Sequence, residues 1–280
     1  LKLKKGAFVS LIVVLMDGTS SKRQLEETEA SVEEVKKLKS APKSIEWNSD
    51  STKLAERVSK NPEISVGVCQ NYVASGWENL LPWAEQLCAK DDAAQDELLY
   101  WETYLAKPDE SVKEQFSRQL KEDVRNMYDQ LLEAGCTNDE ATAVTNSDAA
   151  ESLCDLILHL LDLMPPNSDG QKRFFALQID VNQQGCIKFH DGRRFTSTRI
   201  QVPLHGSGPV LAASEDVDWN FWEAEGGLLS LEEDGEDVDF SVVEEWNQKI
   251  CKSETSTPPG SLILLKGGEV KQPALQRFPY

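Results

Sequence analysis

The hydrophobic period changes at Pro165-Pro166, and this change constrains the fold of the chain more than any other feature. Before the two prolines, apolar residues recur at three- and four-residue steps over 112–131 and 148–164, the spacing of amphipathic helices. After them, the pattern becomes that of strands. Three strands are expected there: 175–181 and 200–204, which alternate, and 262–265, which is wholly apolar.

Further elements are expected in the first half of the chain. The apolar run 64–69 predicts a short buried strand, and the stretch 77–106, rich in large side chains, predicts two helical segments. Ser147 or Asp148 is the expected N-cap of the helix before the prolines. Helices followed by strands, without βαβ alternation, predict an α+β fold with an N-terminal helical layer on a C-terminal antiparallel β-rich half.

Three regions follow from these patterns: an N-terminal apolar segment with a charged linker helix (1–41), a mainly helical region (42–166) and a β-rich region with the candidate site (167–280). The apolar run 7–16 follows three lysines, which fits a signal peptide; a β segment packed on the domain fits equally well. The run is too short for a transmembrane span, which takes about 20 residues.

The net charge of the chain restricts the kinds of partner that it is expected to bind. The chain carries 29 Lys and Arg against 48 Asp and Glu, a formal net charge of −19, and such a field repels nucleic acid and anionic membranes. Thirteen of the acidic residues lie between 200 and 248, where no Lys or Arg occurs. The six cysteines form no C-x-x-C pair, so a zinc ribbon is excluded and a reducing, cytosol-like compartment is favoured.

Candidate metal ligands are found in the β-rich region. His190 and Asp191 end a short alternating segment in which Phe189 and His190 point to opposite faces. An imidazole beside a carboxylate is the starting pair of a non-haem iron site and is also compatible with zinc. A metal site favours a second imidazole, and His205, before a glycine-rich turn, is the other histidine of this region.

Four motifs in order resemble one protein family. They are Cys186-x-x-Phe189-His190, Arg199-Ile200 ahead of Gly206-x-Gly208, Pro259-Gly260 leading into Leu264-Leu265-Lys266-Gly267, and Arg277 with Pro279. Together they resemble the family catalogued as domain of unknown function 1826, over roughly 148–280. The resemblance implies metal handling, with the family pattern C-P-R-F-H-x-D followed far downstream by H-R-S-P. That order is also similar to the ligand triad of jelly-roll oxygenases, which bind iron, a 2-oxo acid and oxygen.

The chain departs from the family at two ligand positions. Its acid, Asp191, is adjacent to His190 instead of two positions on, and Gln276 replaces the downstream histidine. We therefore expect His190 and Asp191 as metal ligands for iron or zinc, with His205 as a third. The residues expected to bind substrate, for instance through its carboxylate, are Arg199, Lys266, Gln276 and Arg277.

Two function classes remain open from the sequence. The first is a jelly-roll-like or cupin-like metal-binding protein, or an enzyme resembling the non-haem iron oxygenases, with a degenerate ligand set. The second is a non-catalytic interaction protein whose acidic, tryptophan-bearing stretch 215–246 binds a partner, since aromatic residues are enriched at interfaces.

Overall fold

The computed structural model describes most of the regular elements of the chain. The described residues are 9–17, 44–72, 76–88, 100–106, 118–119, 121–122, 126, 140–163, 173–181, 189, 198–206, 208–224, 240–258, 260–266 and 274–277. Two sheets and their covering helices account for nearly all of them.

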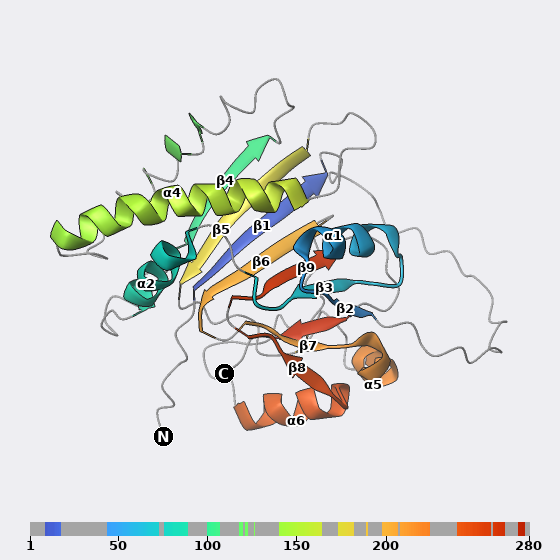
Figure 1. Ribbon diagram of the computed structural model, residues 1–280. Helices are drawn as coiled ribbons and strands as arrows, with labels where there is room; N and C mark the ends of the chain where they lie inside the picture. The colour runs from blue at the N-terminus through green and yellow to red at the C-terminus, as the bar shows by residue number, and fades with distance from the viewer. Residues whose placement is uncertain are drawn as a thin grey trace.

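A seven-stranded sheet forms the centre of the fold (Figure 1). Its strands, in order across the sheet, are β2 (Ile45–Trp47), β3 (Val66–Cys69), β9 (Leu262–Lys266), β6 (Thr198–His205), β1 (Val9–Asp17), β5 (Arg173–Val181) and β4 (Tyr100–Ala106). Neighbouring strands are antiparallel except for β2 and β3, which are parallel. All three regions expected from the sequence therefore contribute strands to one sheet.

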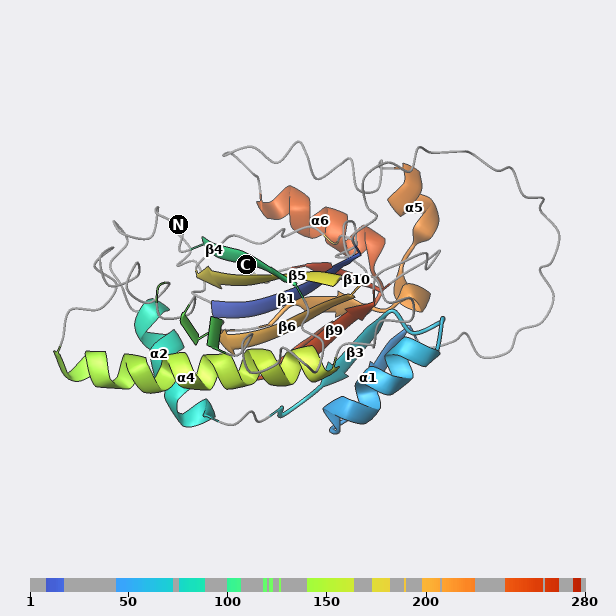
Figure 2. The same cartoon turned by 90° about the horizontal axis from the view of Figure 1, so that it is seen from above.

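Helices α1 (Ser51–Lys60), α2 (Trp77–Cys88) and α4 (Glu140–Leu163) cover one face of this sheet (Figure 2). Asp50 is the N-cap of helix α1, and its side chain accepts a hydrogen bond from the Lys53 backbone N–H at 3.0 Å. The apolar residues of α4 recur at helical spacing and form a stripe, which is buried in the core that this helix shares with α2 and β6. The stripe consists of Leu153, Leu156, Ile157 and Leu160, each at most 1% exposed.

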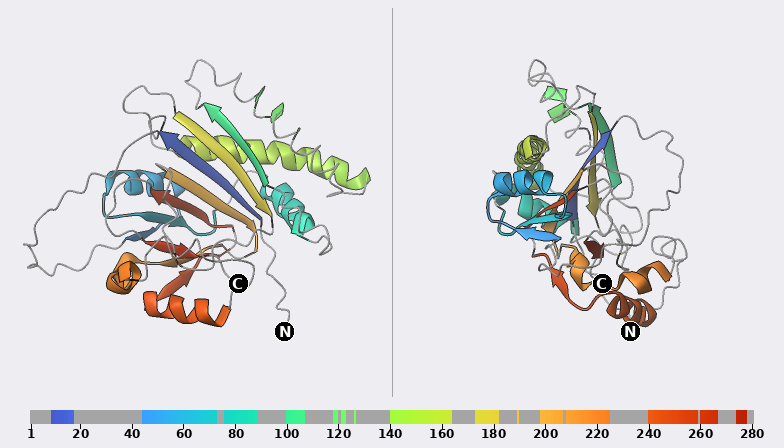
Figure 3. Two further views of the ribbon diagram at one scale, coloured as in Figure 1. Left: turned by 180° about the vertical axis from the view of Figure 1, so that it is seen from behind. Right: turned by 90° about the vertical axis from the view of Figure 1, so that its right-hand side faces the viewer.

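A three-stranded sheet packs on the other face of the large one (Figure 3). Its order is β10 (Leu275–Arg277), β7 (Val210–Ala212) and β8 (Glu254–Ser256), all antiparallel. Alternation along β7 joins two cores: Leu211 packs with Ile263 of β9, whereas Val210 and Ala212 pack with α5 (Trp219–Ala224) and α6 (Phe240–Ile250). The small sheet is thus covered by the large sheet on one side and by two helices on the other.

The expected α+β class is confirmed, with the helical layer on an antiparallel-rich sheet. The expected strands appear as β3, β5, β6 and β9. The expected helix before the prolines is α4, but the N-cap prediction is wrong because Ser147 and Asp148 lie inside that helix, which begins at Glu140. The periodic segment 112–131 and the linker helix lie largely or wholly outside the described residues.

The second helical segment expected within 77–106 is also wrong, because residues 100–106 form strand β4. Pairing with β5 supplies its hydrogen bonds, and tertiary pairing overrides a weak local pattern. The jelly-roll arrangement is not confirmed by the described strands. The apolar run near the N-terminus contains β1, which pairs with β5 and β6.

Candidate functional site

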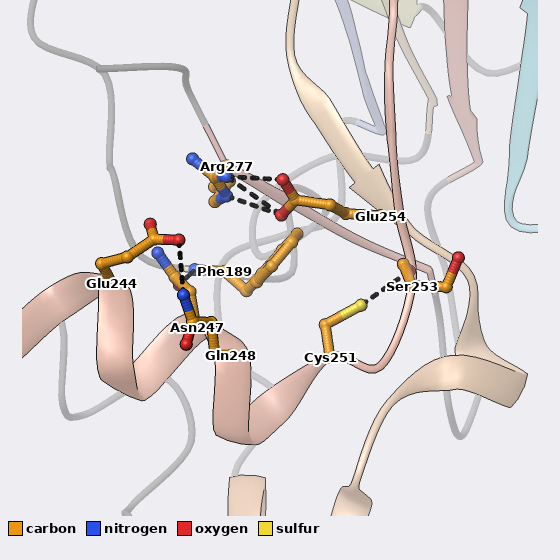
Figure 4. A network of polar contacts seen from close by, with 8 residues as sticks. All are labelled: Phe189, Glu244, Asn247, Gln248, Cys251, Ser253, Glu254 and Arg277. Atoms are coloured by element: carbon orange, nitrogen blue, oxygen red, sulfur yellow. Dashed lines mark hydrogen bonds and ion pairs between the residues drawn. The ribbon is translucent and has the colours of Figure 1, made fainter.

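The small sheet contains a buried arginine, Arg277. The Arg277 side chain is 7% exposed, and its Nη2 atom lies 2.9 Å from both carboxylate oxygens of Glu254 (Figure 4). Its Nε atom donates to the same carboxylate at 3.3 Å. The pair joins β10 to β8 across the intervening β7, so a forked, charge-assisted contact connects the two outer strands of this sheet.

Phe189 lies directly beneath this arginine. The guanidinium carbon of Arg277 is 5.4 Å from the centre of the Phe189 ring, a cation–π contact, and the ring is fully buried. The Phe189 backbone N–H donates to Asn247 Oδ1 on α6 at 3.0 Å, and Asn247 is itself buried. The position immediately before His190 is therefore held by β10 on one side and by α6 on the other.

Cys251 follows α6 at the same site. Its Sγ atom donates to the Ser253 carbonyl oxygen at 2.8 Å, and burial raises the pKa of the thiol to about 11. The side chain is consequently a neutral hydrogen-bond donor at pH 7, not a thiolate. Nucleophilic catalysis and thiolate ligation by Cys251 are both disfavoured.

Two glutamines occupy the sides of the sheets that face each other. Gln276 of β10 pairs in register with Leu211, which packs against the large sheet, and Gln201 of β6 pairs with Ile263, which packs against Leu211. Each glutamine is 1% exposed. Gln201 Oε1 has no hydrogen-bond partner among the described residues. Arg199 lies two residues before Gln201 and so on the same side of β6.

Lys266 ends β9 and reaches the C-terminus of α1. Its Nζ atom donates to the carbonyl oxygens of Val58 and Asn61 at 3.0 Å and of Ser59 at 3.4 Å. Burial lowers the pKa of this ammonium group. Carbonyls at a helix C-terminus lack intrahelical partners and carry partial negative charge, so the lysine acts as a cap for α1.

Replacing Lys266 with methionine is expected to lower the free energy of unfolding by about 1–2 kcal/mol, because the α1 carbonyls lose their charged donor while the aliphatic contacts remain. Urea denaturation followed by circular dichroism measures this loss. Lys60→Met is the matched control, since Lys60 forms an exposed pair with Glu56 and should leave the midpoint unchanged. Equal midpoints for wild type and Lys266→Met would contradict the capping role.

The predicted metal ligands are only partly covered by the structure. His190 and Asp191 lie outside the described residues. His205 ends β6, half-buried and paired in register with Val9. Within the described segments, no three His, Cys, Asp or Glu side chains are grouped closely enough to hold a metal ion. The ligand set therefore stays a prediction that depends on residues 190 and 191.

Among the residues predicted to bind substrate, the structure places Arg277 and Gln276 next to each other on one strand, with side chains on opposite sides of it, and places Lys266 at the end of β9 next to α1. Sequence reasoning missed Glu254 and Asn247. Glu254 is one carboxylate among many and lies 23 residues before its partner, so no local pattern distinguished it. An asparagine inside a helical pattern was the one available signal for Asn247, since that residue type is unfavourable there without a partner.

Comparisons with known proteins give no relative: no family model matches the chain, and no curated protein or solved structure matches it. Across the described segments, no helix combines the length and apolar character needed to cross a membrane.

Proposed function

We propose that the protein binds a divalent metal ion, iron or zinc, through His190 and Asp191, in a jelly-roll-like arrangement similar to that of the non-haem iron oxygenases. The observation that carries the proposal is the contact between Phe189 and Arg277. It anchors the residue before His190 against β10, the strand on which Gln276 stands where the family pattern has its second histidine.

Strand connectivity supports the proposal. From β6 onward the chain alternates between the sheets: β6 is in the large sheet, β7 and β8 in the small one, β9 in the large one and β10 in the small one. Such repeated crossing between two facing sheets is the type of connection found in jelly rolls.

The donor chemistry fits a first-row metal. An imidazole nitrogen and a carboxylate oxygen suit iron or zinc, whereas calcium and magnesium prefer oxygen ligands alone. Adjacent strand residues point to opposite faces, so both side chains reach one ion only where the strand ends or bulges. When bound, such a metal would polarise an oxygen of a bound substrate. The chain's own contribution is to orient His190 through Phe189, which Asn247 and Arg277 hold in place.

Metal content of untagged protein tests the proposal, measured by elemental analysis before and after reconstitution with ferrous iron or zinc. Near-stoichiometric metal is expected in wild type and is expected to be lost in His190→Ala, because a ligand is removed. His159→Ala is the matched control, since this exposed histidine on α4 stacks on Tyr72 and should not change metal content. Absence of metal from reconstituted wild type, or unchanged metal in His190→Ala, would contradict the proposal.

The acidic stretch supports a second candidate, binding of a basic partner. Glu215, Asp218, Glu223 and Glu245 are exposed around α5 and α6, which supplies the charge. The tryptophans have a different role: Trp222 is 7% exposed and packs against Trp219 and Trp246 at ring-centre distances of 6.5 and 5.9 Å. They form the core beneath the helices, so this candidate depends on charge. Titration with a lysine-rich peptide at low and high salt tests it; affinity that is absent or insensitive to salt argues against it.

A further inference from the structure

We draw no further inference here: the strongest candidate, the outer edge of β2 beside the 38% exposed Trp47, pairs with no other strand in the described part of the chain, but nothing in the structure shows what covers it.

Discussion

Replacing Gly76 with alanine is expected to lower the free energy of unfolding by about 2–5 kcal/mol, from left-handed backbone strain and overpacking together. Gly76 has φ +82°, and a Cβ atom added to it would lie 2.2 Å from Ser152 Oγ and 2.4 Å from Ser152 Cβ. Ser152 belongs to α4 and is buried, so it has little room to move. The glycine carbonyl also accepts the first hydrogen bonds of α2, from Asn79 and Leu80.

Gly260→Ala is the matched control for the Gly76 substitution. Gly260 has φ +71°, but nothing lies within 4 Å of an added Cβ atom, so backbone strain alone is expected to cost about 1–2 kcal/mol. Urea denaturation of both variants measures the difference. Equal losses would show that α2 and α4 do not pack as closely at Gly76 as the structure describes.

Replacing Glu254 with glutamine is expected to lower the free energy of unfolding by about 2–4 kcal/mol, because the buried Arg277 guanidinium loses its charged, forked partner. The reverse substitution, Arg277→Met, is expected to cost less, about 1–2 kcal/mol. It leaves behind a carboxylate that is 45% exposed and can be hydrated, and methionine retains part of the packing on Phe189. This inequality follows from the different burial of the two partners.

Chemical denaturation of both variants measures the asymmetry, with Glu245→Gln as control. Glu245 pairs with Lys249 on the surface of α6, where its side chain is 69% exposed, so no measurable loss is expected from that variant. A greater loss in Arg277→Met than in Glu254→Gln would contradict the burial argument.

Periodicity in the sequence was sufficient to predict the helices and strands whose hydrophobic pattern was long or wholly apolar. Helix α4 and strand β9 are examples, because burial of one stripe or of both faces leaves a clear signal. Residues 100–106 were assigned wrongly, since Trp101, Tyr104 and Leu105 also fit helical spacing. Their strand state depends on β5, which begins at Arg173, and a local pattern contains no information about so distant a partner.

Local sequence patterns were also insufficient to predict the contacts of the candidate site. Arg277 was recognised from its motif, but its partner Glu254 and the supporting Asn247 come from other strands and helices and have no fixed spacing from it. Gln201 resembled an ordinary polar residue of an alternating strand. Only the packing of the small sheet on the large one explains why its amide is buried.

The position of β1 in the sheet determines when, during synthesis of the chain, this strand can pair with its neighbours. Val9 pairs in register with both Val181 and His205, so β1 lies between two strands that are synthesised much later than β1 itself. At ribosomal rates of about 5–20 residues per second, β1 waits about 10–40 s for its second partner to be made. The edge of β1 that pairs with β6 has no such partner for that time, and sheets closed by such distant pairings fold slowly. The centre of the large sheet therefore cannot be completed until residue 205 has been made.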